Sequence, residues 1–370
     1  MSVLVIGAGA AGLAVGACLK RANVPCIIVE QNDTVGSVWR RHYDRLHLHT
    51  DKSNSELPFA HFPRDYPRYI SRDQLVDYLE RYAKQFQLDI RFNQEVKSAR
   101  RDKGTWTIIT QNSAYQADRL VIASGYSRRP NRPTWRGLET FPGRVLHSSE
   151  YKIGSTFKGQ KVLVVGFGNS GGEIAIDLHE QGARPDLSVR QAVNVIPREL
   201  AGIPILSIGI AQRRIPSRLA DAINAPILRA AVGDIKKYGL QKLPYGPITQ
   251  IRKDRRIPLI DIGTMKLIRN GNIVVRRGVR EVARSKVRFD DDTEANYDAL
   301  ILATGYRPHV NEFLQQAEGA LDAEGTPAVT GKESPISGLY FCGFFVSPTG
   351  MLREIALEAK RVSAAIAEQK

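Results

Sequence analysis

Val3-Leu4-Val5-Ile6-Gly7-Ala8-Gly9-Ala10-Ala11-Gly12 opens the chain and decides its fold. The four leading apolar residues predict a buried strand, and a helix rich in alanine and leucine is expected after the G-x-G-x-x-G turn, to about residue 19. A second predicted strand, residues 26–29, ends in Glu30, about 20 residues beyond the glycines. The glycines permit a tight turn, close approach of a pyrophosphate and close helix packing. The stretch therefore predicts a dinucleotide site in which Glu30 binds a ribose hydroxyl.

The same pattern occurs a second time, in residues 161–190. A predicted strand at 161–165 precedes Gly166-Phe167-Gly168-Asn169-Ser170-Gly171, a helix to about residue 178, and a strand near 187–189. This strand ends in Arg190, and a guanidinium suits the 2′-phosphate of NADPH where a carboxylate would repel it. Gln191 follows in place of a second phosphate ligand, so acceptance of NADH stays open. So does the interpretation of Arg190 as a plain surface residue.

Each copy leads to a predicted antiparallel meander and then to a buried strand with a small-small-Gly end, in residues 105–126 and 285–306. We therefore predict an α/β fold with two Rossmann-like dinucleotide-binding domains of the three-layer ββα type, the NADPH domain being inserted into the FAD domain. The expected bounds are 1–155 for the first part of the FAD domain, 156–306 for the NAD(P)H domain with a helical insertion at 200–250, and 307–370 for the second part of the FAD domain.

The composition restricts the classes of partner. Among 370 residues, 53 Lys and Arg outnumber 38 Asp and Glu, a net charge of +15 that fits a solvated basic face or the attraction of phosphate-bearing cofactors. No polybasic tail, zinc-finger spacing or RNP-like strand occurs, so no nucleic-acid partner is expected. No apolar run reaches the roughly 18 residues of a membrane span, and the early strand leaves no room for a signal peptide. We expect a cytoplasmic protein and leave a homodimer open.

The reactive side chains narrow the chemistry. Two dinucleotide sites imply electron transfer from a nicotinamide to a flavin, and Cys18, Cys26 and Cys342 form no C-x-x-C pair that would accept those electrons. A quinone or metal acceptor needs a further carrier site, of which the sequence has no sign. The histidines at 42, 47 and 49 fit a loop beside a flavin, so no metal is expected. Elimination favours O2 as acceptor and leaves both an oxidase and a monooxygenase open.

A further motif carries a family resemblance. Residues 141–151 fit F-x-G-x-x-x-H-x-x-x-Y through Phe141, Gly143, His147 and Tyr151. This motif resembles the fingerprint of flavin-containing monooxygenases and their class B relatives. The resemblance covers nearly the whole chain and is greatest to the YUCCA-type plant branch and its bacterial counterparts, through residues 43–50, 78–83, 168–171, 260–264 and 303–306.

The resemblance implies a reaction. NADPH would reduce FAD, O2 would add to give a C4a-hydroperoxyflavin, and one oxygen atom would pass to a small soft nucleophile such as a thioether, an amine or indole, or to a ketone. These are sulfoxidation and Baeyer–Villiger chemistry. The alternatives are a YUCCA-like oxidative decarboxylation of an indole-3-pyruvate-type acid, a flavoprotein NAD(P)H oxidase or reductase, and a flavin-bearing binding protein recruited through its charge.

The motifs and the resemblance together imply the site residues. Those expected at FAD are Gly7, Gly9, Ala11, Gly12, Glu30, Val38, Trp39, Arg40, His49, Thr50, Val96, Gly343 and Leu352. Those expected at NADP are Gly166, Gly168, Asn169, Ser170, Gly171, Arg190 and Gln191. The family places an Asn beside the flavin in a segment of the form Asn-x-x-Lys-Glu; no Asn in residues 50–56 is clearly in register, and Asn54 is the catalytic candidate. For His147 a structural role is favoured over acid–base catalysis, and for residues 200–245 a substrate lid over a dimer face or a membrane contact.

Overall fold

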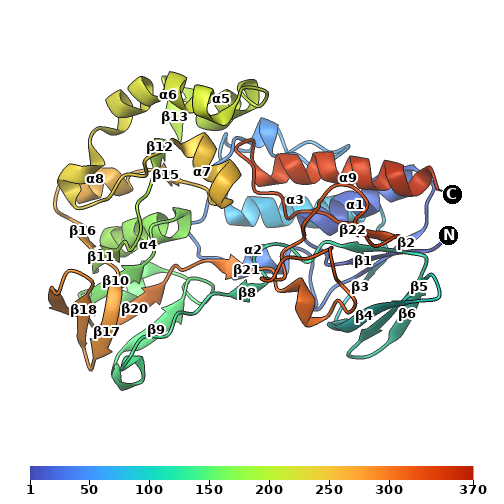
Figure 1. Ribbon diagram of the computed structural model, residues 1–370, viewed down its shortest axis with the longest axis horizontal. Helices are drawn as coiled ribbons and strands as arrows, with labels where there is room; N and C mark the ends of the chain where they lie inside the picture. Colours follow the sequence, from blue (N-terminus) through green and yellow to red (C-terminus); the bar gives the residue numbers. More distant parts are fainter. Residues whose placement is uncertain (370) are drawn as a thin grey trace.

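Two five-stranded parallel sheets organise the chain in the computed structural model, which describes residues 1–369 (Figure 1). The first sheet has the order β22-β7-β1-β2-β3, with β1 at Val3–Ile6, β2 at Cys26–Val29, β3 at Ile90–Arg91, β7 at Arg119–Ile122 and β22 at Leu339–Phe341. The second has the order β16-β11-β10-β20-β9, with β9 at Arg144–His147, β10 at Lys161–Val165, β11 at Arg184–Ser188, β16 at Val274–Arg276 and β20 at Ala299–Leu302.

Successive residues of the central strands point to opposite faces of the sheet, and each face is covered by a different layer. Val3 and Val5 of β1 pack with the helices α1 (Ala10–Arg21), α3 (Arg72–Gln85) and α9 (Met351–Ala367), whereas Leu4 and Ile6 pack with a meander on the other face. That meander consists of β4 (Val96–Asp102), β5 (Thr105–Thr110) and β6 (Ala114–Ala117). A parallel strand buried on both faces reads as a continuous apolar run, which is what the sequence contains.

The second sheet repeats this arrangement. Val162 and Val164 of β10 pack with α4 (Asn169–Glu180), and Leu163 and Val165 pack with the meander β17 (Val279–Ala283), β18 (Lys286–Phe289) and β19 (Glu294–Asn296). The α/β fold with two Rossmann-like units is therefore confirmed. The first sheet receives its last strand, β22, after the second sheet is complete, so one unit is inserted into the other. The exact domain bounds stay a prediction, and β9 lies in the second sheet although it precedes the predicted boundary at 155.

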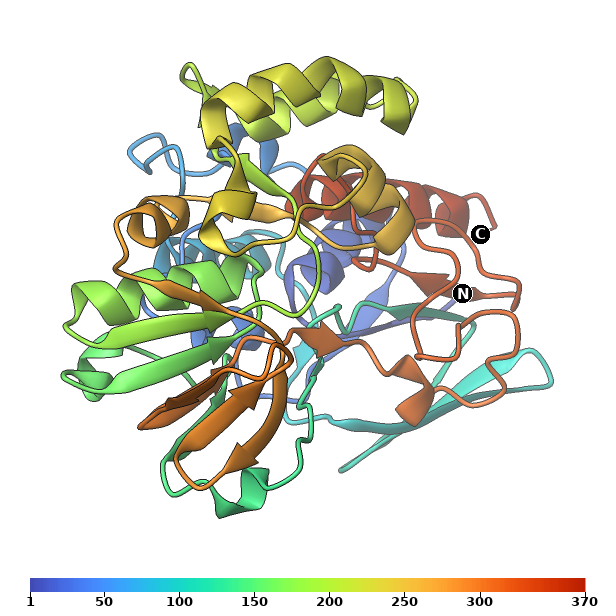
Figure 2. The ribbon, with the colours of Figure 1, turned by 60° about the vertical axis from the view of Figure 1, so that its left-hand side comes forward.

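Helices between residues 203 and 254 cover the junction of the two halves. Figure 2 shows α5 (Ile205–Ala211) and α6 (Ser217–Val232) over the top of the molecule, with α7 (Pro247–Asp254) beneath them. The remaining short elements are α2 (Ser37–Arg41), η1 (Lys52–Asn54), β8 (Arg129–Pro130), η2 (Leu138–Thr140), η3 (Gly154–Phe157), β12 (Val195–Pro197), β13 (Glu199–Leu200), β14 (Ile203–Pro204), η4 (Ile235–Tyr238), β15 (Leu259–Asp261), α8 (Thr264–Arg269), β21 (Tyr306–Arg307) and η5 (Val310–Glu312). Within the described residues, none of the helices is both long and apolar enough to span a bilayer.

The fingerprint motif lies in the core beside the junction of the halves. A β-carbon at Gly143 would lie 2.0 Å from the carbonyl oxygen of Asp298. The ring of His147 is fully buried, with Nε2 3.1 Å from the carbonyl oxygen of Gly305, and burial lowers its pKa. Tyr151 donates a 2.5 Å hydrogen bond to Asp177. This packing supports the structural role favoured for His147.

The Tyr151 hydrogen bond gives a stability prediction. Tyr151→Phe leaves the buried Asp177 carboxylate with the amide of Gly154 as its remaining donor. Hydrogen bonds to charged groups contribute about 1.5–3 kcal/mol, so we expect the free energy of unfolding to fall by about 2 kcal/mol in a urea titration. The control is Tyr115→Phe, because no hydrogen bond of the Tyr115 side chain occurs among residues 1–369. Equal losses in the two variants would contradict this account.

Candidate functional site

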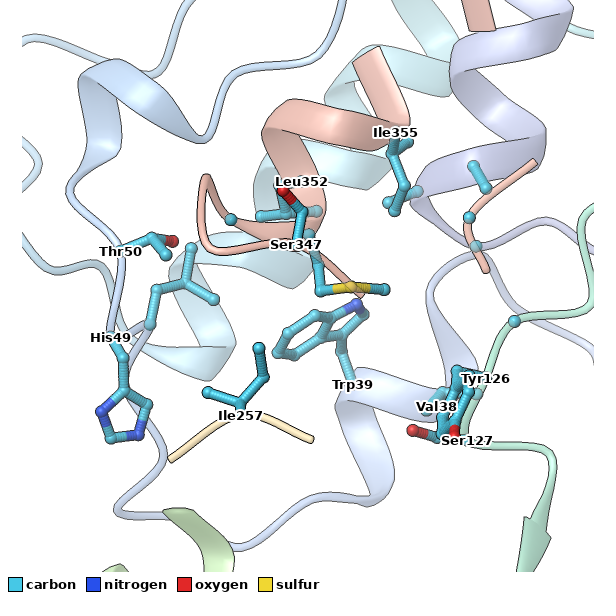
Figure 3. Close-up of a pocket in the computed structure, with 18 of the residues that line it drawn as sticks. Val38, Trp39, His49, Thr50, Tyr126, Ser127, Ile257, Ser347, Leu352 and Ile355 are labelled. Atoms are coloured by element: carbon cyan, nitrogen blue, oxygen red, sulfur yellow. The ribbon is translucent and has the colours of Figure 1, made fainter. Parts of the chain in front are cut away.

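A cavity of about 500 Å³ lies where the two halves and the helical insertion meet. Its lining comes from the first glycine turn, from α2, from the linker after β7, from the start of α4, from the loop before α9, and from α5 to α7. Figure 3 shows Trp39 in the middle of this space, between the loop of His49 and Thr50 and the linker of Tyr126 and Ser127. The cavity therefore draws on every large part of the fold.

Glycine is required at this turn because the backbones touch. A β-carbon at Gly7, which has a φ of +106°, would lie 2.6 Å from the carbonyl oxygen of Ala123, and one at Gly12 would lie 1.8 Å from that of Gly7. Gly9 precedes the first residue of α1 and has no atom within 4 Å in its side-chain direction. The amide end of α1 thus opens on the cavity with no side chain or acidic residue capping it. Such an end binds anions, so this turn fits a pyrophosphate.

Glu30 forms the polar floor of the same region. Its carboxylate is buried and accepts hydrogen bonds from the backbone amides of Ala8 at 2.8 Å and Asn32 at 3.0 Å. These amides fix the carboxylate at the end of β2, where it lines the cavity. Oε1 also accepts from the Asn32 side-chain amide at 2.6 Å and from the Ser37 hydroxyl at 3.4 Å, so Oε2, which accepts from Ala8, is the oxygen with a lone pair left for a ribose hydroxyl.

Two further polar groups at the cavity have no hydrogen-bond partner among residues 1–369. They are the hydroxyl of Ser124, two residues after β7, and the imidazole of His49, whose Nδ1 and Nε2 both lack a hydrogen bond. Buried polar groups are normally satisfied, so both groups indicate a polar ligand in this space. The glycine turn, the Glu30 carboxylate and these two groups fit a bound dinucleotide.

A close contact between two buried polar side chains connects the two halves at the edge of the cavity. Nε2 of His49, in the loop after α2, lies 3.0 Å from Oε1 of Glu173 on α4, and the Glu173 side chain is only 2 % exposed. The neighbouring Tyr43 is also buried, and burial followed by the nearby Glu173 carboxylate raises the pKa of its hydroxyl well above the ordinary range. This pair fixes the start of α4 against the first half.

The structure brings most residues predicted at FAD to the cavity. Those lining it are Gly7, Gly9, Ala11, Glu30, Val38, Trp39, His49, Thr50, Val96, Gly343 and Leu352. Gly12 is buried under the turn, and the Arg40 side chain instead pairs with Glu80 on the outer side of α2. Asn54 also lies outside the lining, because its amide donates to both carboxylate oxygens of Asp51, at 3.1 and 2.9 Å. Nothing in this geometry brings Asn54 to a reacting atom.

Of the residues predicted at NADP, one lines the cavity and the others lie outside its lining. Asn169, the first residue of α4, lines the cavity. Gly166, Gly168, Ser170, Gly171, Arg190 and Gln191 lie outside this lining, around the carboxyl end of the second sheet. Gly168 is open in its side-chain direction, as Gly9 is. The exposed Arg190 lies against Gly278, and Arg256 donates to the amide oxygen of Gln191. Two guanidinium groups thus stand near the place where the sequence predicts the 2′-phosphate.

The apolar wall of the cavity was not predicted from the sequence. The wall is aliphatic and comprises Ile196, Leu200, Ile205, Leu206, Ile208, Ile227, Leu228, Ile248, Ile251, Ile257 and Ile260. Its polar members include Gln212 and Asn224, whose amides bond to each other at 3.0 and 2.8 Å and join α5 to α6. The available signal was the aliphatic spacing within 205–208 and 227–228, which sequence reasoning identified only as a partly amphipathic segment.

Comparisons with known proteins agree with this geometry. A profile of the family described as pyridine nucleotide-disulphide oxidoreductase matches residues 4–198. The chain is 40 % identical over 348 residues to indole-3-pyruvate monooxygenase YUCCA1 of Oryza sativa subsp. japonica, covering 92 % of this chain and 86 % of that protein. It is 36 % identical to indole-3-pyruvate monooxygenase YUCCA6 of Arabidopsis thaliana, covering 97 % and 88 %.

Solved structures share the fold at lower identity. A flavin-containing monooxygenase from Stenotrophomonas maltophilia matches with a TM-score of 0.73 at 20 % identity, covering 98 % of both chains. The NADP+-bound cyclohexanone monooxygenase from Rhodococcus sp. Phi1 matches with a TM-score of 0.73 at 19 % identity, covering 99 % of this chain and 84 % of that one.

His42, which also lines the cavity, gives a pH prediction. Burial, and then the positive charges of Lys152, Arg41 and Arg72, lower its pKa from 6.5 to about 4, although Glu173 acts in the opposite direction. Between these values the unfolded chain binds a proton that the folded chain does not. Stability should therefore fall as the pH drops from 6.5 towards 4, by up to about 1.4 kcal/mol per pH unit from this group. Urea titrations should show a shallower decline for His42→Gln, and an unchanged slope would refute the assignment.

Proposed function

Because the chain belongs to the pyridine nucleotide-disulphide oxidoreductase family, and within it to the YUCCA-type flavin-dependent monooxygenases, we propose that it transfers one oxygen atom of O2 to a small substrate with an apolar body, held beneath the helical insertion. It is an enzyme, and its cofactors are FAD and NADPH. One observation supports the proposal above all: a single cavity joins the glycine turn and Glu30 at one end to an aliphatic wall at the other.

The chain's own residues bind and orient the reactants. When bound, FAD reduced by NADPH supplies the activated oxygen, and the protein supplies position and environment. We assign the open amide end of α1 to the FAD pyrophosphate and Glu30 to a ribose hydroxyl. Asn169 stands at the start of α4 and at the cavity, so it would contact the nicotinamide dinucleotide when that is bound.

The aliphatic wall excludes water from the reacting end. The backbone of α5 lies directly on the loop before α9, since a β-carbon at Gly209 would be 2.6 Å from the carbonyl oxygen of Pro348. Isoleucine and leucine side chains of α5, α6 and α7 then cover the space above Trp39. A dry site of this kind suppresses hydrolysis and proton leakage, which would divert reduced oxygen to peroxide.

The cysteines do not support disulphide reduction, which the family description includes. Burial raises the pKa of the Cys18 and Cys26 thiols to about 11 and that of the Cys342 thiol well above its ordinary value. All three are free. The thiolate is the reactive form, and these thiols are protonated at neutral pH. Oxygen is therefore the better supported acceptor.

The relatives favour one substrate class. Proteins 36–40 % identical to this chain are named indole-3-pyruvate monooxygenases. We therefore propose oxidative decarboxylation of an aromatic 2-oxo acid, in which the acid, O2, NADPH and a proton give the shortened acid, CO2, NADP+ and water. The C–C bond between the carbonyl and carboxyl carbons breaks, and one oxygen atom enters the new carboxylate. Oxygen transfer to thioethers, amines, indole or ketones is the second candidate, favoured by the aliphatic wall.

A substrate panel tests the oxygen transfer. The FAD-bound protein is given NADPH with indole-3-pyruvate, a thioether, an amine, indole or a cyclic ketone, while product, CO2 and peroxide are counted. We expect one O2 consumed per product and little peroxide with the preferred substrate, because the aliphatic wall keeps water out. NADPH oxidation that yields only peroxide with every compound would identify an oxidase and refute the proposal.

A second measurement tests the nicotinamide assignment. Arg190→Ala should raise the KM for NADPH by about tenfold, because a charge-assisted hydrogen bond to the 2′-phosphate contributes about 1.4 kcal/mol or more, and should leave the KM for NADH nearly unchanged. Arg184→Ala is the matched control, since Arg184 lies at the other end of β11 and donates to the carbonyl oxygen of Gly159. Equal effects on the two nucleotides would remove Arg190 from this role.

A further inference from the structure

A second cavity, of about 540 Å³, adjoins the site and is strongly basic on one side. It shares Tyr126, Ile251, Ser347 and Pro348 with the first cavity. We infer that this cavity, called here the arginine vestibule, admits the substrate and binds it as an organic carboxylate with an apolar body. The inference rests on the proposed monooxygenase function and narrows its substrate class.

The arginines of the vestibule outnumber its acids. Its lining includes Arg213, Arg214, Arg252 and Arg255 from the insertion, and one acid, Glu354, from α9. Glu354 is already paired, at 3.0 Å, with Arg353, which lies outside the lining. Among residues 1–369, Arg255 has a distant acidic partner, Asp322 at 3.9 Å, and the other three arginines have no ion pair. A cleft lined by one sign of charge attracts ions of the opposite sign, so this one attracts anions.

Arg252 holds the turn that carries Arg213 and Arg214 in place. Its guanidinium donates to the carbonyl oxygen of Arg213 at 2.9 Å and to the hydroxyl of Ser217 at 3.1 Å. These bonds fix the turn between α5 and α6, which carries Arg213 and Arg214. Arg252 is thus a positioning residue. Arg213 donates to the backbone of Ile210 at 3.2 Å, and no hydrogen bond of the Arg214 side chain occurs in the described part of the chain. Both retain donors for a carboxylate.

The vestibule also carries an exposed aromatic surface. The Phe345 side chain lines it and is 46 % exposed, whereas the neighbouring Phe344 is buried. Exposed phenylalanine beside arginine suits a ligand with an apolar or aromatic body and a negative end. From Phe345 the chain runs through Ser347 and Pro348 into the wall shared with the first cavity, where Figure 3 shows Ser347 above Trp39. The arginines can therefore capture the carboxylate first, and the substrate can then follow this wall into the first cavity, where the bond next to its carboxylate reacts.

The phosphates of NADPH are the competing source of negative charge. The glycine turn before α4 and Arg190 already provide a phosphate site outside the vestibule. The two sources differ in one measurable way: removing vestibule arginines affects the affinity for the carboxylate in one case and for NADPH in the other.

The test is the double variant Arg213→Gln/Arg214→Gln of the FAD-bound protein. Calorimetric titration with indole-3-pyruvate should show a Kd raised by about fivefold to tenfold, and its KM should rise in parallel while kcat stays within about twofold. The Kd for indole-3-pyruvate should also depend less on salt concentration, between about 50 and 300 mM, in the double variant than in the unmodified protein. The reason is that fewer charges are left for the salt to screen. The KM for NADPH and the oxygenation of a neutral thioether should not change.

A matched control removes two charges elsewhere. Arg218→Gln/Arg229→Gln alters α6 at exposed arginines that line neither cavity, so it should leave the Kd for indole-3-pyruvate unchanged. Equal weakening in both double variants, no weakening in either, or a loss of NADPH affinity alone would overturn the inference. The titration needs no turnover. If the panel yields only peroxide, the proposed function fails while the binding result still decides whether the vestibule takes carboxylates.

Discussion

The meeting of the first glycine turn and the first residue of α4 at one cavity is the constraint on which the rest of the structure depends. Gly9 precedes α1 and Asn169 begins α4, and both residues line the same space although 160 positions separate them in the sequence. Each end is kept bare by glycines at which a β-carbon would collide with backbone. Two anionic dinucleotides can therefore approach one another, and the halves also touch where Nε2 of His49 lies 3.0 Å from Oε1 of Glu173.

The cavity has a polar end and an aliphatic end, and these two ends suit different parts of the cofactors and substrate. Glu30, Ser124 and the open end of α1 lie at one end, and isoleucine and leucine side chains form the other. Charged cofactor parts suit the first end, because fixed amides and carboxylates replace their hydration. A substrate with an apolar body suits the second, because its lining is aliphatic. Trp39 lines the same cavity as both sets of residues, and Figure 3 shows it beside Ile257.

Short sequence patterns correctly predicted the strands, turns and helices whose formation depends on residues close together in the sequence. Val3 to Gly12 and Lys161 to Gly171 gave the strands, turns and helices correctly, since strand burial and glycine spacing are visible in a few residues. Glu30 followed from its place at the end of a strand. Arg40 and Asn54 illustrate the limit: motif spacing cannot reveal that Glu80 or Asp51 takes their hydrogen bonds. The vestibule joins the turn after α5 to Phe345, across more than 100 residues, and no linear motif records such a meeting.

The two crossings of the chain between its halves have a mechanical consequence. The strands β8 and β21 pair antiparallel, Tyr306 opposite Pro130 and Arg307 opposite Arg129, so the outgoing and returning segments form one short ribbon. Hydrogen bonds across a ribbon resist sliding of one segment past the other, whereas bending is opposed far less. The two connections are thus held side by side over these residue pairs, so neither can slide along the other without breaking the ribbon.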